Sequence, residues 1–423
     1  MGKRIRTILL YLFLTGILCL AGCGRGQSDK EPTLPVGPAS TVPVTLTPPT
    51  APTEAETASV TFPLVPDESW QAAQAAALER AAQIMEQMSD EELICQMLVV
   101  APETVSPEVT VLTGAGLELN KFPVGGLLLH TENGESAEQL LALCQAMQEA
   151  SDIPLLLMAQ EEGGRSVTFM KSLEQTVIRN MFSYRGDGRA RAFENAKTLA
   201  SNLLSLGLNT DLAPVADVWS DMNNKYIGER AYSDDFEKAA VLIEEAVQGF
   251  RAAGAISCLK YFPGGGEGLV ENKKDPFALL QKTEAQLLNN ELIPFAAGIQ
   301  AGADMVMIGS FSLPAIDPVN LAPFSPFVVS GLLREKVGFQ GVVITDELEN
   351  LLTSQILTAS GACLKAIAAG CDLLLCPVSS EEDLEECIQV LLAAMEAGTL
   401  TRERLTESVG RILALKIRQG LMK

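Results

Sequence analysis

Side chains able to bind or transform a ligand follow several short apolar segments of this 423-residue chain. The run Gln160–Arg165 supplies an amide, two carboxyl groups and a guanidinium, while Lys260 and Tyr261 close a second segment. Asp346 closes a third segment, and Arg230 follows a fourth. Acids, Arg and Lys gathered around one opening suit a ligand that carries many hydroxyl groups or negative charge. The sequence predicts a site for such a ligand, provided that the fold brings these segments together.

A barrel of parallel strands would bring them together at one end. Eight apolar runs alternate with amphipathic segments, which favours an α/β fold of the (β/α)8 TIM type over an open doubly wound sheet. No Gly-x-Gly-x-x-Gly follows the first run, which counts against a dinucleotide fold. In such a barrel, ligands bind where the strands end. The predicted strands are Gln96–Val100, Gly125–His130, Pro154–Gln160, Thr210–Pro214, Ala255–Phe262, Ala303–Gly309, Gly341–Asp346 and Asp372–Pro377, and predicted helices include Ser136–Ala150, Ala190–Leu206, Asp235–Ala253 and Leu400–Leu421.

Composition excludes several classes of protein and site. Lys and Arg number 31 against 53 Asp and Glu, a formal net charge of −22 that excludes a basic nucleic-acid surface. Hydrophobic residues make up 47% of the chain, which excludes wholesale disorder. The single histidine, His130, excludes a His-rich metal site. We expect a structural role for His130 at a strand end, and a role in the site is the alternative.

Seven cysteines lie beyond the N-terminal segment, an odd number that does not indicate a disulfide framework. Most stand in apolar surroundings, so we interpret them as small buried thiols. Cys371 and Cys376 flank a predicted strand without metal-ligand spacing, and we expect neither a metal nor a cofactor. The seven are Cys95, Cys144, Cys258, Cys363, Cys371, Cys376 and Cys387.

The N-terminal segment predicts export and anchoring. Residues 1–22 combine a basic start with the apolar run Ile8–Leu20, as a signal peptide does, and the following Cys23 resembles the lipidated residue of a bacterial lipobox. An ordinary signal with a chance cysteine is the alternative. Residues 23–68 contain nine of the 22 prolines, which favours an extended tether. We expect a monomer whose residues 69–423 form one catalytic domain on the extracytoplasmic face of the cell membrane, attached through lipid alone.

Five ordered segments resemble motifs of glycoside hydrolase family 3, and within it of the single-domain bacterial β-N-acetylhexosaminidases. The likeness runs from about Met88 to Leu421. It implies a (β/α)8 barrel that hydrolyses β-linked N-acetylhexosaminides, including cell-wall fragments, with retention of configuration. The segments are Gln160–Arg165 (D-Q-E-G-G-R), Leu208–Val218 (N-x-D-x-A-P-V-x-D-V), Gly228–Tyr232 (G-x-R-S-F), Lys260–Gly266 (K-H-F-P-G-H-G) and Gly338–Asp346 (G-F-x-G-x-x-x-[ST]-D).

The resemblance assigns roles to individual residues. Asp346 takes the position of the nucleophile, which attacks the anomeric carbon and forms a glycosyl-enzyme. Gly163 and Gly164 would let the backbone approach the ligand. Arg230 and Lys260 would donate hydrogen bonds to sugar hydroxyls, with a structural ion pair as the alternative. The expected substrate-binding residues are Gln160, Arg165, Arg230, Lys260 and Tyr261, of which Arg165 could equally brace the barrel.

The chain departs from the family pattern at the proton-transfer loop. The family continues D-T-x-x-D-S-H, in which the His acts as acid and base and the Asp orients it. Here Lys273 stands in place of that His and Glu271 in place of the Asp. A lysine of ordinary pKa is a poor acid and base at neutral pH. Other family ligand positions are changed too: an Asp to Gln160, and three His to Tyr261, Gly265 and Ser310.

These departures leave three interpretations open. The first is an active glycosidase with a substitute acid/base, for which Glu271 is the best candidate because it lies on the same loop. Glu267, Glu161 and Glu347 are weaker candidates. The second is a catalytically inactive lipoprotein, a pseudoenzyme that binds sugars or muropeptides. The third, Schiff-base chemistry at Lys260, has no support from a depressed lysine pKa.

Overall fold

The structure is a computed structural model. Cys23, the predicted tether apart from Phe62, Leu64 and Glu68, and the loop residues Glu271 and Lys273 lie outside the residues that it describes, so the predictions made for them stay predictions. Within the described part, no helix has both the length and the apolar character needed to cross a bilayer. The described residues are Phe62, Leu64, 68–106, 119–268, 277–348 and 357–422.

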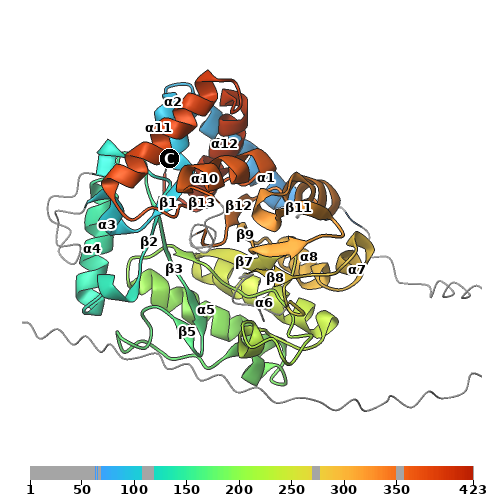
Figure 1. Ribbon diagram of the computed structural model, residues 1–423. Coiled ribbons are helices and arrows are strands. Elements are labelled where there is room, and N and C mark those ends of the chain that lie inside the picture. Colours follow the sequence, from blue (N-terminus) through green and yellow to red (C-terminus); the bar gives the residue numbers. More distant parts are fainter. Residues whose placement is uncertain are drawn as a thin grey trace, which may run out of the picture. The chain divides into compact units, whose positions relative to one another are not determined.

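Eight parallel strands form the barrel that the sequence predicts (Figure 1). A parallel bridge between Ile344 and Leu373 joins the two ends of the sheet and closes it. Each predicted strand contains an observed strand, and all eight observed strands are shorter than predicted. For example, β6 covers only Thr210 and Asp211, although Leu212 still donates its N–H to the Ala159 carbonyl oxygen at 2.9 Å. In barrel order the strands are β12 (Val342–Thr345), β9 (Met305–Ile308), β7 (Ile256–Phe262), β6 (Thr210–Asp211), β3 (Leu156–Ala159), β2 (Gly126–Leu128), β1 (Leu98–Val100) and β13 (Leu374–Leu375).

Amphipathic helices surround the barrel and bury their apolar faces against it. The helix α6 is representative: the Asp235 side chain caps its first turn, and Gly254, with φ 91°, ends it. The four predicted helices are confirmed within a few residues, whereas α1, packed along α12, was not predicted. The main helices are α1 (Glu68–Met85), α2 (Asp90–Gln96), α4 (Ala137–Glu149), α5 (Arg189–Ser205), α6 (Phe236–Ala253), α8 (Leu292–Gln300), η6 (Phe327–Val337), α10 (Ala359–Ala369), α11 (Glu381–Glu396) and α12 (Arg402–Arg418).

A buried ion-pair network supports the end of the barrel opposite the strand C-termini. Asp372 precedes β13 and is fully buried, 2.5 Å from Arg334 and 2.8 Å from Arg411. Although burial raises the pKa of Asp372, these guanidinium groups hold it below its ordinary value. Charged groups at this end of a TIM barrel serve stability rather than chemistry.

Two small sheets extend the strand ends on the side of the predicted site. The hairpin β4 (Glu161–Gly163) and β5 (Ser166–Val167) contains the two glycines, which have φ of 81° at Gly163 and 63° at Gly164. A Cβ on Gly163 would lie 2.8 Å from the Arg179 carbonyl oxygen. The glycines therefore form a tight turn against neighbouring backbone, which corrects the expectation that they admit a ligand. The second sheet comprises β8 (Ala278–Leu279), β10 (Phe311–Leu313) and β11 (Asp317–Leu321).

Candidate active site

Asp346 is held at the barrel mouth by the strands beneath it. It follows β12 directly, and its backbone N–H donates to the Ile308 carbonyl oxygen at 3.0 Å. The preceding Thr345 is buried and accepts a bond from the Leu375 N–H at 3.1 Å, which ties β12 to β13. The Asp346 carboxylate accepts the Glu347 N–H at 2.9 Å. Burial raises the pKa of Asp346 to about 6, so the carboxyl is mostly ionised at neutral pH.

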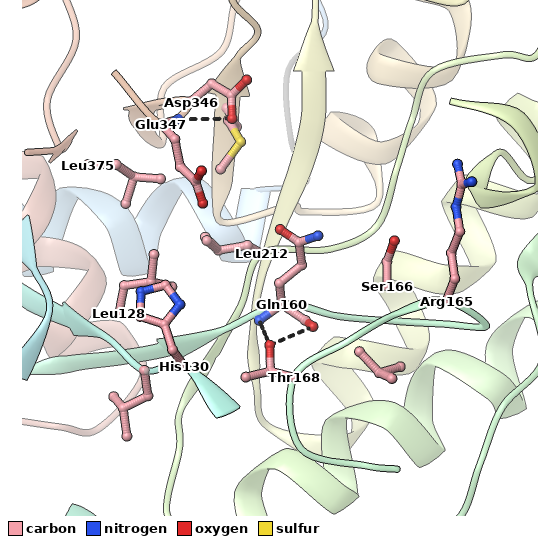
Figure 2. A pocket seen from close by; sticks show the side chains of 13 residues that line it. Leu128, His130, Gln160, Arg165, Ser166, Thr168, Leu212, Asp346, Glu347 and Leu375 are labelled. Carbon is pink, nitrogen blue, oxygen red and sulfur yellow. Dashed lines mark hydrogen bonds between the residues drawn. The ribbon is translucent and has the colours of Figure 1, made fainter. Parts of the chain in front are cut away.

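Asp346 lines a cavity of about 320 Å³, within the range of about 300–1,000 Å³ common for ligand pockets. Figure 2 shows the Glu347 carboxylate, the His130 ring and the Gln160 amide around this cavity. Gln160 therefore lies where the resemblance places a substrate-binding residue. For His130 the structure favours a role in the site over a purely structural role, because its ring faces the cavity. Its backbone N–H donates to the Asn133 side chain at 2.7 Å and so starts the next turn.

A second cavity of about 470 Å³ also contains Asp346, together with Tyr226, Arg230 and Tyr261. The two tyrosine rings lie 5.9 Å apart, and the Arg230 guanidinium lies 5.1 Å from the Tyr226 ring. A narrower space of about 100 Å³ beside Ser310 adjoins the same carboxylate. The mouth thus offers room for a sugar, an aromatic wall and several hydrogen-bonding groups. Sequence reasoning did not find Tyr226, which stands in a loop without any motif.

One buried acid organises the cations of the site. Glu162 accepts two bonds from the Arg230 guanidinium, both of 2.7 Å, and lies 2.5 Å from the Lys260 ammonium. Although burial raises the pKa of Glu162, the two cations hold it below its ordinary value. Arg230 also donates to the Tyr261 hydroxyl at 2.7 Å and reaches the cavity. Lys260 is 0% exposed and lines none of the three cavities, so the structure places it in an ion pair and corrects the expected direct sugar contact.

A group of hydrogen bonds fixes the start of the loop for which proton transfer is expected. The Asp217 carboxylate accepts the N–H groups of Tyr261 at 3.1 Å and Gly265 at 2.9 Å, and burial raises its pKa to about 7. The Asn224 side-chain amide donates to the carbonyl oxygens of Gly265 and Gly268, both at 2.9 Å. The loop is thus anchored as far as Gly268. Asn224 is a second residue of this region that sequence reasoning did not find.

Arg165 braces this region. It is exposed at the turn of the β4–β5 hairpin, and its guanidinium donates to the carbonyl oxygens of Lys225 at 2.6 Å and Tyr226 at 3.1 Å. These bonds hold the loop that carries Tyr226. Of the two roles expected for Arg165, the structure supports bracing, although part of its side chain also lines the cavities.

The structure separates the weaker acid/base candidates. Glu161 is 1% exposed and lines none of the cavities at the mouth, so it cannot contact a ligand there. Glu267 forms an ion pair of 2.8 Å with Lys282. Glu347 lines the cavity beside Asp346. Glu271 lies outside the part of the chain that the structure describes.

Residues 91–415 match the family model described as "Glycosyl hydrolase family 3 N terminal domain". The chain belongs to glycosyl hydrolase family 3. A "Beta-hexosaminidase" of Xylella fastidiosa (strain M12) is 35% identical over 257 residues, which are 60% of this chain and 76% of the relative. "Beta-hexosaminidase A" of Pseudoalteromonas piscicida is 29% identical over 341 residues, 75% of this chain and 56% of the relative. The predicted family and its relation to bacterial hexosaminidases are thereby confirmed.

Two solved structures show a similar fold, the first of them described as a member of glycoside hydrolase family 3. A beta-N-acetylglucosaminidase from Paenibacillus sp. str. FPU-7 superimposes with a TM-score of 0.71 at 31% identity, over 79% of this chain and 63% of that one. The Beta-N-acetylhexosaminidase from Beutenbergia cavernae DSM 12333 gives a TM-score of 0.67 at 26% identity, over 78% of this chain and 99% of that one. This chain spans less than two thirds of the Pseudoalteromonas and Paenibacillus proteins.

Proposed function

We propose that the protein is a retaining glycoside hydrolase that cleaves β-linked N-acetylhexosaminides, with Asp346 as the nucleophile. The observation that carries the proposal is the position of Asp346, at a strand end and facing sugar-sized space. The substrate class follows from the relatives, which are named as hexosaminidases. The expected position outside the membrane adds cell-wall fragments as natural substrates.

The surroundings of Asp346 suit nucleophilic attack. The carboxylate attacks the anomeric carbon as the glycosidic bond breaks, and water later cleaves the glycosyl-enzyme. A pKa of about 6 leaves the carboxylate ionised at neutral pH but less solvated than in water. Lys260 and Arg230 favour the ionised form through their charge. Arg230, Gln160 and the Tyr261 hydroxyl would orient the sugar, with the ring of Tyr226 against its apolar face.

A second group must protonate the leaving oxygen and then activate water. We assign this role to Glu271. It lies three residues after Gly268, which lines the same space as Asp346, so the chain can place it within about 10 Å of that glycine. A carboxyl group enclosed by the loop and a ligand would have the raised pKa that an acid requires.

A second candidate function rests on one observation. Lys273 stands where the family has its acid/base histidine. A chain that kept the sugar pocket and lost proton transfer would be an inactive sugar- or muropeptide-binding lipoprotein.

A panel of aryl β-glycosides tests both functions. A dinitrophenyl leaving group needs no proton, whereas a sugar leaving group does. The proposal expects turnover of activated and natural N-acetylglucosaminides and loss of both in Asp346→Ala. In Glu271→Gln it expects loss of the natural substrate, while the activated substrate gives a burst of dinitrophenol followed by slow turnover, because the water that cleaves the glycosyl-enzyme is no longer activated. Glu267→Gln is the matched control on the same loop and keeps both activities. No turnover of either substrate, together with a higher melting temperature in N-acetylglucosamine, would establish the binding protein instead.

We also propose that the chain is exported and lipidated at Cys23, as its N-terminal sequence indicates. Labelling of cells with a radioactive fatty acid should mark the wild-type protein and leave Cys23→Ala unmarked. Equal labelling of both proteins would refute the assignment.

A further inference from the structure

Three buried thiols converge outside the barrel mouth. Cys363 lies on α10, Cys376 follows β13 directly, and Cys387 lies on α11. Their three sulfur atoms all lie within 4.8 Å of one another, and those of Cys363 and Cys376 are 3.6 Å apart. Sequence spacing did not reveal the group, because the packing of two helices against a strand end creates it.

We propose that Cys363, Cys376 and Cys387 form a trisulfur site for one Cu(I) ion. Soft thiolate ligands select Cu(I), Zn(II) and iron–sulfur clusters. A planar three-coordinate ion with metal–sulfur bonds of about 2.3 Å holds its sulfur atoms about 4.0 Å apart. The separation of 3.6 Å and the upper limit of 4.8 Å for the other two are close to this value, so small side-chain adjustments close the site.

The number of ligands distinguishes Cu(I) from Zn(II). Structural zinc takes four protein ligands in a tetrahedron. Among the described residues, no fourth Cys, His, Asp or Glu joins this group. Three ligands of sulfur alone suit Cu(I), which accepts trigonal coordination.

Ordinary packing does not account for the convergence. Four further cysteines in the described part are equally buried, yet none of them belongs to such a group. A disulfide does not account for it either, because its sulfur atoms are about 2.0 Å apart and it would leave one thiol over.

The ion has a route to the site. Cys376 is 8% exposed and lines a cavity of about 620 Å³ together with Glu103, His130 and Glu347. Cys363 and Cys387 are more deeply buried. Binding exchanges thiol protons for the metal, so affinity should fall as the pH is lowered.

The experiment is a copper competition on the full chain. The protein is reduced under anaerobic conditions and titrated with Cu(I) in the presence of bathocuproine disulfonate. We expect one retained Cu(I) per chain, three sulfur neighbours by X-ray absorption, and loss of that ion in Cys376→Ala. The matched control is Cys144→Ala, which removes an equally buried thiol on α4 and should retain the copper.

Circular dichroism of each variant shows whether it is folded, and Cys387→Ala replaces Cys376→Ala if the latter is not. No copper resistant to the competitor would overturn the proposal. Equal loss in the control, or a preference for Zn(II) in parallel dialysis, would overturn it as well. The site is independent of glycoside hydrolysis, so neither result affects the other.

Discussion

We predict that replacement by Gln has opposite effects on stability at two adjacent residues, Glu161 and Glu162. Both lie buried on β4, but Glu162 faces two cations while Glu161 faces none. One carboxylate oxygen of Glu161 accepts the N–H groups of Phe169 at 2.5 Å and Met170 at 3.3 Å. Its other oxygen has no partner among the described residues. Burial therefore raises the pKa of Glu161 to about 7.

The magnitude follows from the shift in pKa. The pKa of Glu161 is higher in the folded chain than in the unfolded chain, so protonation of Glu161 favours the folded state. This contribution to stability is fully present near pH 4 and is lost as the pH rises through about 7. A shift from 4.5 to about 7 corresponds to about 3 kcal/mol of unfolding free energy at pH 8. Glutamine keeps an oxygen for the two N–H groups and removes the charge. Glu161→Gln should therefore stabilise the protein by up to about 3 kcal/mol at pH 8 and by little at pH 4.

Thermal and urea unfolding at both pH values measure the effect. Glu162→Gln is the matched variant: it leaves Arg230 and Lys260 buried without their counter-ion and should destabilise the fold by about 3–5 kcal/mol. A Glu161→Gln protein no more stable than wild type at pH 8 would refute the reasoning. A gain of equal size at both pH values would refute it too, because it could not arise from titration of Glu161.

Three further predictions concern the site and the core. The rate kcat/KM on an aryl glycoside should fall below about pH 6, because Asp346 must be ionised to attack; a profile flat to pH 4.5 would contradict this. Arg230→Lys cannot form the two-bond contact with Glu162 and should lower kcat/KM by at least about tenfold, measured on the same substrate. Burial lowers the pKa of Lys416 from 10.5 to about 7, so the free energy of unfolding decreases as the pH falls from about 10.5 towards 7. Lys416→Met removes this buried charge and should raise the midpoint of urea unfolding at pH 7.

Features encoded in short stretches of sequence could be predicted. Apolar runs specified all eight strands, since strands of a parallel sheet are buried on both faces. Asp346 stood out because it directly follows such a run, and its expected role came from the resemblance to family 3. The fold then places it at the mouth without any further information.

Features that depend on distant contacts could not be predicted. The sequence shows Lys260 at a strand end, but only the fold reveals that its ammonium meets Glu162 and not the cavity. Tyr226 and Asn224 act from a loop without a motif, and His130 faces the cavity because of the packing around β2. The three-cysteine group likewise arises from elements that meet only in the folded chain.

Mass spectrometry of the protein treated with a fluorinated N-acetylhexosamine inactivator tests the central claim most directly. Slow hydrolysis of the trapped intermediate lets the modified residue be identified after digestion. The account predicts one added glycosyl group per chain, on the peptide that contains Asp346, and none in Asp346→Ala. A glycosyl group on any other carboxylate would contradict it.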